Sequence, residues 1–206
     1  MSITGLKIVR ELQNEKCYDI DVNPVYKKNI CTSRSFGREI ESIGDLKQSV
    51  STYAIRCAEK LRMQKSCAAY ISVFIHTNPF RSNQSQYNGY KCVRFDYPTN
   101  DNYDLVKSAM YLLDSIYHKD YRYKRAGVIV GGILPESQIQ LDLFDRDIDM
   151  NERKVLMKTI DSINGRMGRD KIRLAIQGVD HKWGFKQRNL SPCYTTRWSD
   201  LLQVSC

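Results

Sequence analysis

Two short stretches of this 206-residue chain carry residue types that can bind a partner. The first runs from Gln140 to Phe144, where an amide, two leucines and an aromatic ring, at Gln140, Leu141, Leu143 and Phe144, form a compact peptide anchor. An exposed linker with this much apolar surface favours docking of its Leu and Phe side chains into a pocket of another protein. The alternatives are the end of a strand, or a leucine pair that folds back onto its own domain.

The second stretch, Thr32 to Arg38, holds hydroxyls, two guanidiniums and a glycine at the end of an expected strand. Hydroxyls, arginines and backbone N–H groups are the usual ligands of phosphate, and a glycine lets the backbone approach closely. Cations on two later strands extend this track. The candidate DNA-binding residues are Ser33, Arg34, Ser35, Gly37, Arg38, Lys91, Arg94, Lys124 and Arg125. Such contacts are salt-sensitive and read no base sequence, and for any one of these residues the alternative is a solvated surface charge.

Catalytic motifs are missing from the sequence. It contains no phosphate-binding P-loop, no dinucleotide-binding glycine pattern, no zinc-protease helix and no nucleophile elbow. Asp145 to Asp149 alternates acids like a calcium loop but lacks the following glycine and the closing glutamate, which favours a solvated acidic patch. Cys31 or Cys57 would need a histidine partner to act as a nucleophile, and the sequence points to none. The residues therefore predict no catalytic group, no metal site and no cofactor on this chain.

The positive charge of the chain is unevenly placed. The formal net charge is +9, and residues 27–132 alone hold 17 basic and nine acidic side chains. This segment is the candidate for contact with a polyanion, and nucleic acid is favoured over an anionic membrane because no amphipathic membrane helix or lipidation signal accompanies the charge. A basic surface with no partner is the remaining alternative.

The cysteine pattern indicates a reducing compartment. Seven cysteines are widely spread, never in C-x-x-C spacing, and the three histidines are equally scattered. A disulfide framework or a zinc site is therefore not expected. The start lacks the apolar core of a signal peptide, and no run of about eighteen apolar residues occurs. We expect a cytoplasmic protein that contacts no membrane.

Hydrophobic periodicity predicts the elements. A short helical segment is predicted over 5–12, and an irregular linker joins it to the basic segment. Alternating patterns predict strands over 27–36, 69–77, 90–96 and 124–133, and helical spacing predicts helices over 45–63, with Asp45 as N-cap, and 102–117. A further helix is expected over 152–167 and a short strand over 171–177.

The order β-α-β-β-α-β predicts an α+β fold, in which a four-stranded antiparallel sheet carries both helices on one face. A small α/β extension would follow it. The other sheet face is left open to a nucleic-acid backbone, unless another domain covers it. The same order suits RNA-recognition sheets, but their aromatic signature is absent, and only Tyr70 and Phe74 favour that reading.

Several motifs resemble one known family. The stretch Cys31 to Gly37, the helix from Tyr53 to Leu61 and the peptide from Gln140 to Phe144 resemble the C-terminal half of the UmuC family. These proteins are the catalytic subunits of bacterial DNA polymerase V, within the Y-family translesion polymerases. The resemblance extends to the tail through Ile163 to Arg169, Gln177-Gly178, Trp183, Leu190 to Arg197 and Asp200 to Leu202.

The resemblance implies a domain organisation. Residues 1–26 would be the end of the thumb and its tether, and residues 27–133 the little-finger domain that grips primer–template DNA. Residues 134–151 would be a linker that carries the sliding-clamp binding peptide, with Gln140, Leu141, Leu143 and Phe144 as its contact positions. Residues 152–206 would be a C-terminal extension associated with the UmuD′ and RecA partners. The protein would then act at the bacterial nucleoid in the SOS response to DNA damage.

The sequence also departs from the pattern of this family in one respect. The family's palm, whose carboxylates hold Mg²⁺ for phosphoryl transfer, has no counterpart in this sequence. We therefore expect a non-catalytic fragment of an error-prone polymerase that binds DNA and the clamp, with Mg²⁺ needed only alongside the missing palm. The alternatives are the downstream half of a split, active polymerase V subunit, and a competitive regulator of the intact enzyme.

Overall fold

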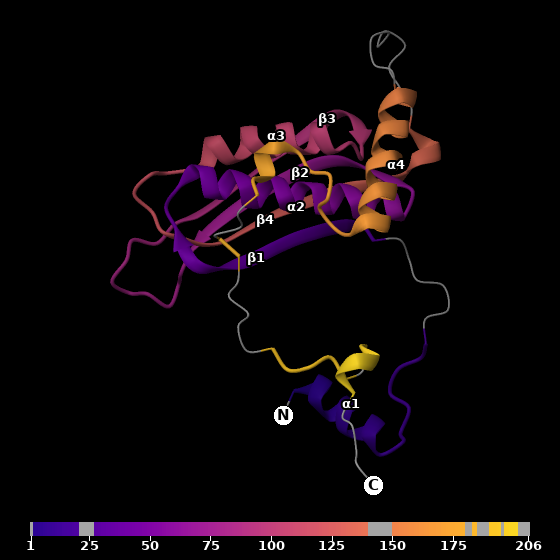
Figure 1. Cartoon of the computed structure of the whole chain (residues 1–206). Coiled ribbons are helices and arrows are strands. Elements are labelled where there is room, and N and C mark those ends of the chain that lie inside the picture. Colours follow the sequence, from indigo (N-terminus) through magenta and orange to yellow (C-terminus); the bar gives the residue numbers. More distant parts are fainter. Residues whose placement is uncertain are drawn as a thin grey trace.

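A computed structural model of the chain describes residues 2–20, 27–139, 150–179, 183–184, 190–194 and 196–201. A four-stranded antiparallel sheet forms its centre, with strand order β1-β4-β2-β3, and two helices cover one face (Figure 1). The helices and strands are α1 (Ile3–Leu12), β1 (Asn29–Ile40), α2 (Ile43–Met63), β2 (Ser66–Thr77), β3 (Asn88–Thr99), α3 (Asn102–Ile116), β4 (Tyr123–Pro135) and α4 (Met150–Met167). The predicted β-α-β-β-α-β order and the antiparallel sheet are confirmed.

Alternation along β2 sorts its side chains between the two faces of the sheet. Ile71, Val73 and Ile75 are fully buried against the helices. Because successive side chains of a strand point to opposite faces, the intervening residues lie on the face that bears no helix. These are Tyr70, Ser72, Phe74 and His76.

Helix α2 buries the stripe that helical spacing predicts, including Leu46, Val50 and Leu61, against the sheet. The predicted N-cap is wrong: Ser42 holds the cap position, and Asp45 lies in the first turn. An acid in the first turn is favoured there by the helix dipole, which explains why the sequence signal fell three residues late. At α3 the cap is Asp101, whose carboxylate accepts a hydrogen bond from the backbone N–H of Tyr103 at 2.7 Å.

The predicted strand over 171–177 is also wrong. Residues Ala175–Gln177 instead form a 3₁₀ turn that packs against α2. Local hydrogen bonds close this turn: the N–H of Gln177 donates to the carbonyl of Leu174, and that of Gly178 to the carbonyl of Ala175. The alternating pattern misleads because a strand needs a neighbouring strand to satisfy its backbone, and no described strand pairs with this segment.

Arg62 fastens α4 to the end of α2. Its guanidinium donates to both carboxylate oxygens of Asp161 on α4, at 2.7 and 2.8 Å. It also donates to the carbonyl of Asn100 at 2.6 Å and to the side chain of Asn102 at 2.9 Å. Because only 10% of the Arg62 side chain is exposed, these partners replace water around its charge.

Replacing Arg62 with Gln is expected to lower the free energy of unfolding by about 2 kcal/mol, because it removes charge-assisted hydrogen bonds and leaves Asp161 unpaired. Urea unfolding followed by circular dichroism measures this change. The matched control is Lys158→Gln, an exposed lysine on α4, which should change stability by less than about 0.5 kcal/mol. Equal losses from the two variants would show that Arg62 contributes only charge.

Candidate nucleic-acid interface

The face of the sheet opposite α2 and α3 is the candidate interface. Within the described residues, α2 and α3 pack on one face and no helix packs on the other (Figure 1). Strand register decides which side chains point to this uncovered face. On the two outer strands they include Ser33, Ser35, Tyr90 and Arg94.

Arg125 on β4 is the centre of the polar part of this face. Its guanidinium donates a hydrogen bond to Oγ of Ser33 at 3.0 Å, and Ser35 is its direct partner across the strand pair. The guanidinium also lies over the ring of Phe74, 5.7 Å from the ring centre. Two hydroxyls beside a guanidinium are a donor set that suits a phosphate oxygen. Of the predicted residues, Ser33, Ser35 and Arg125 are thus brought together.

A partly buried histidine, His76, lies next to this cluster. Desolvation by burial, followed by repulsion from the Arg125 guanidinium, lowers the pKa of His76 below its ordinary value. His76 therefore stays neutral around Arg125 at neutral pH. The ring of Phe74 is 5.0 Å from that of His76, so aromatic surface continues the face toward β3.

Arg94 extends the face to the opposite edge. It lies on β3 directly across from Tyr70 and is exposed. The arrangement runs from the hydroxyls of β1 across Arg125 and the aromatic rings of β2 to Arg94 on β3. It places one cation on each side of the aromatic rings of β2, Arg125 on β4 and Arg94 on β3, and such a surface can follow two phosphate-bearing backbones or one backbone and its bases.

Lys91 does not lie on the uncovered face with the other predicted DNA-binding residues. It stands across from Val73, whose side chain faces the helices, so Lys91 points to the helix side of the sheet. There its ammonium lies 5.9 Å from the ring centre of Tyr111 on α3. A one-residue step along a strand reverses the face, which is why Lys91 and Arg94, three residues apart, are separated by the sheet.

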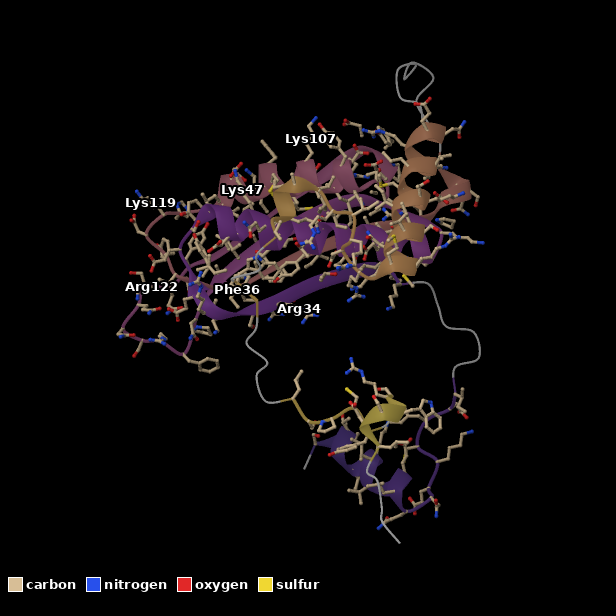
Figure 2. The ribbon with its side chains drawn as sticks, in the orientation of Figure 1. Arg34, Phe36, Lys47, Lys107, Lys119 and Arg122 are labelled. Carbon is tan, nitrogen blue, oxygen red and sulfur yellow. The ribbon has the colours of Figure 1, made fainter. Side chains whose placement is uncertain are left out.

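The remaining predicted residues lie along or beside β1. Arg34 lies on the helix side of β1, as does Thr32, at the edge of the sheet (Figure 2). Lys47 and Lys107, also labelled in Figure 2, belong to the helices α2 and α3. Lys124 donates to the carbonyl of Phe36 at 2.7 Å, and Arg38 is 3.8 Å from Asp45. The N–H of Gly37 donates to the carbonyl of Trp183 at 3.5 Å. The stretch from Ser33 to Arg38 therefore divides between two faces of one strand.

Two glycines of β4 make room for aromatic rings on this face. Gly127 and Gly131 stand directly across from Phe74 and Tyr70 on β2. A Cβ atom on Gly127 would lie 2.3 Å from the Phe74 ring, and one on Gly131 would lie 2.2 Å from the Tyr70 hydroxyl. The aromatic rings thus lie over bare backbone. The equal four-residue spacing of the glycines and of the aromatics was the sequence signal for this packing.

The predicted clamp-binding residues Gln140, Leu141, Leu143 and Phe144 lie outside the described residues. A 3₁₀ turn at Glu136–Gln138 precedes them, and α4 follows from Met150. The acidic patch over 145–149 also falls outside.

The described residues offer little for nucleophilic or metal chemistry. Burial raises the pKa of Cys57 to about 11 and that of Cys67 to about 12, so both thiols stay protonated near neutral pH. No three histidine, cysteine or acidic side chains gather around a possible metal position in the described ranges, which therefore do not fit the Mg²⁺ ions of a polymerase. Across the same ranges, no helix has the length and apolar character to span a bilayer.

A four-stranded antiparallel sheet with both helices on one face is the α+β fold that the order of elements predicts. The chain matches the family model described as the impB/mucB/samB family C-terminal domain over residues 27–143, and it belongs to this family. A domain of unknown function (DUF4113) matches residues 154–204. The expected resemblance to UmuC proteins is confirmed.

Two curated relatives match nearly the whole of this chain. Protein UmuC of Salmonella typhimurium is 37% identical over 198 residues, which cover 96% of this chain and 47% of that protein. Protein MucB of Escherichia coli is 35% identical over 195 residues, which cover 95% of this chain and 46% of that protein. The chain spans about half the length of the curated relatives it matches.

Solved structures are more distant. A post-insertion binary complex of Dbh DNA polymerase aligns with a TM-score of 0.43 and 16% identity, over 64% of this chain and 36% of that one. The little finger domain of PolIV, solved in complex with the beta-clamp processivity factor, aligns with a TM-score of 0.39 and 15% identity. That alignment covers 56% of this chain and 98% of the other.

Proposed function

We propose that this chain is a DNA-holding module of an error-prone polymerase, which grips the backbone of primer–template DNA with its uncovered sheet face. The observation that carries the proposal is the cluster of Ser33, Ser35 and Arg125, with Arg94 at the far edge of the same face. Membership of the impB/mucB/samB family supports it, because the matched region includes all four strands.

The second part of the proposal concerns the peptide from Gln140 to Phe144, which we assign to a sliding clamp. The DNA-holding face and this peptide are joined by a short stretch of chain after β4. Two weak contacts joined by a short linker bind far more tightly than either alone, because the second contact forms at a high effective concentration. The tail would add contacts to UmuD′ and RecA, as the family resemblance implies.

The third part is that this chain does not extend primers by itself. Two-metal phosphoryl transfer needs carboxylates that hold the ions close together, and the described residues supply no such group. In this proposal the chain positions a polymerase on damaged template, and Mg²⁺ binds elsewhere in the complete enzyme.

The test is DNA binding by Arg125→Gln. The variant should bind a primer–template duplex about tenfold more weakly, and the slope of log affinity against log salt should fall by about 1, because one phosphate contact is lost. Fluorescence anisotropy at several salt concentrations measures both quantities.

The matched control is Lys91→Gln, which removes the same charge from the helix side of the sheet. Its affinity should stay within about twofold of the wild type. Equal losses from Arg125→Gln and Lys91→Gln would refute the sheet face as the interface, since a long-range charge effect would then explain both.

A further inference from the structure

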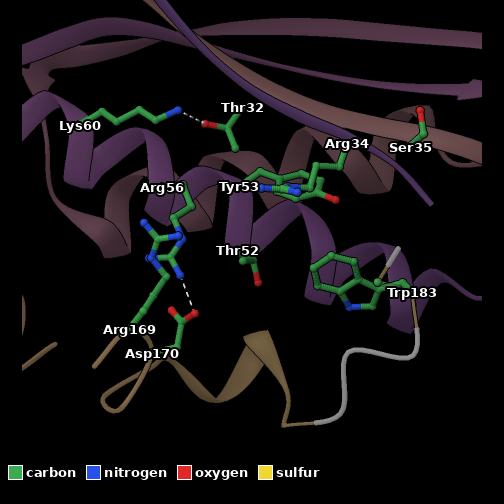
Figure 3. A pocket seen from close by; sticks show the side chains of 11 residues that line it. Thr32, Arg34, Ser35, Thr52, Tyr53, Arg56, Lys60, Arg169, Asp170 and Trp183 are labelled. Atoms are coloured by element: carbon green, nitrogen blue, oxygen red, sulfur yellow. Dashed lines mark hydrogen bonds and ion pairs between the residues drawn. The ribbon is translucent and has the colours of Figure 1, made fainter. Parts of the chain in front are cut away.

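A cavity of about 430 Å³ lies beside β1, chiefly on its helix side, and shares Ser35 with the proposed DNA face. Three separate segments form its walls (Figure 3). Thr32, Arg34 and Ser35 come from β1, and Thr52, Tyr53, Arg56 and Lys60 come from α2. Arg169, Asp170, Trp183 and Gly184 come from the tail. The tail thus completes a pocket that the sheet domain alone leaves open.

The charge of the pocket is positive. Arg34, Arg56, Lys60 and Arg169 line it. Among the described residues, Asp170 and Glu59 oppose them, and both pair with the Arg56 guanidinium. Arg56 is therefore neutralised and held in place, whereas Arg34 and Arg169 make no ion pair with any described residue. The ammonium of Lys60 donates to Oγ1 of Thr32 at 3.1 Å and keeps two further N–H groups.

The Tyr53 hydroxyl is the second, independent sign of a ligand. Its side chain is only 2% exposed, and the hydroxyl has no hydrogen-bond partner among the described residues. Its ring is fixed edge-on to that of Trp183, with ring centres 5.8 Å apart. Burial raises the pKa of Tyr53, and the neighbouring Arg34 guanidinium lowers it by a smaller amount. A buried hydroxyl without a partner is rare, because it gives up water and gains nothing.

We propose that this pocket binds a phosphoryl group, carried by a free nucleotide or by the end of a nucleic-acid strand. Guanidiniums from β1 and from the tail, with an ammonium and a hydroxyl from α2, line one space, and a tetrahedral oxyanion has acceptors in several directions. The Arg169 guanidinium, which forms no ion pair with a described residue, and the Tyr53 hydroxyl, which has no hydrogen-bond partner among them, would bind the phosphoryl oxygens. The volume leaves room for a group larger than the phosphate itself.

The test uses the full chain and three probes: inorganic phosphate, deoxyadenosine monophosphate, and an oligonucleotide with or without a 5′-phosphate. Phosphate should shift the backbone amide signals of Thr32, Thr52 and Arg169 in nuclear magnetic resonance titrations. Arg169→Gln should weaken phosphate binding about tenfold, and Tyr53→Phe about threefold, because each removes one donor and leaves the fold in place. The matched control is Arg166→Gln, an exposed arginine on α4 outside the pocket, which should not change binding.

The probes separate the two sources. A mononucleotide that binds more tightly than phosphate, with no preference for phosphorylated oligonucleotide ends, identifies a free nucleotide. A preference for the 5′-phosphorylated oligonucleotide that Arg169→Gln abolishes identifies a strand end. Shifts that sulfate reproduces equally, or that Arg166→Gln reduces as much as Arg169→Gln, would mean an adventitious ion only and would overturn the proposal. So would the absence of any shift at these amides. Arg125→Gln should leave phosphate binding intact, which keeps this test distinct from that of the DNA face.

Discussion

The double variant Leu143→Ala, Phe144→Ala is expected to abolish binding to a sliding clamp while leaving DNA affinity unchanged. Burial of a leucine or phenylalanine side chain contributes about 1.5–3 kcal/mol, so the loss of both should weaken the complex by at least a factor of about 100. Surface plasmon resonance on immobilised clamp measures this loss. Anisotropy with a primer–template duplex measures the DNA affinity of the same samples.

The control for this prediction removes similar apolar surface nearby. Val155 and Leu156 on α4 are 63% and 54% exposed, and their joint replacement by alanine should leave clamp binding unchanged. Clamp binding that survives the loss of Leu143 and Phe144, or falls equally in both double variants, would rule out the peptide as the specific contact.

Gly127→Val is expected to lower the free energy of unfolding by about 3 kcal/mol. A Cβ atom at this position would lie 2.5 Å from Cβ of Ser33 on β1 and 2.3 Å from the Phe74 ring on β2. The ring can rotate away, but Cβ of Ser33 is fixed by its backbone, so the strands themselves must move apart. Urea unfolding measures the change, and reduced DNA affinity should accompany it because Ser33 and Arg125 lie beside Gly127.

Gly165→Ala gives the opposite sign and serves as the comparison. Nothing lies within 4 Å of the added Cβ atom, and Gly165 belongs to helix α4. Alanine should raise stability by about 0.5 kcal/mol, because it favours the helical backbone. A Gly127→Val variant as stable as the wild type would show that Phe74 and Ser33 have room to yield, which would contradict close packing over β4.

The order of elements was predictable from periodicity. Ile71, Val73 and Ile75 alternate with polar or aromatic residues, and Leu46, Val50 and Leu61 recur at helical spacing, so the sheet and its helices follow from pattern alone. Strand ends were less predictable: β1 was expected to stop at residue 36 but continues to Ile40. Its register shifts between Ser35 and Ile40, and such an irregularity has no periodic signal.

The face of each binding residue was harder to predict. Beyond Ile30, β1 carries hydroxyls on both of its sides, at Thr32 and at Ser33, so these polar residues do not by themselves reveal that Ser33 faces away from the helices. Pairing with β4, whose Ala126 and Val128 are fully buried, sets the phase, in agreement with the buried Ile30 and Phe36 of β1 itself. The pocket was unpredictable for a related reason, since Arg169 and Trp183 come from a segment with no clear periodicity.

Trp183 lies 7% exposed within the same apolar cluster as Phe36 and Tyr53, so the C-terminal extension and the sheet share a single interior. Shortening the gene after β4 would therefore not release an intact smaller unit. It would uncover Phe36 on the strand that also carries Ser33, and it would strip Arg62 of Asp161. Any displacement of Trp183 would therefore expose Phe36 on the strand that carries Ser33.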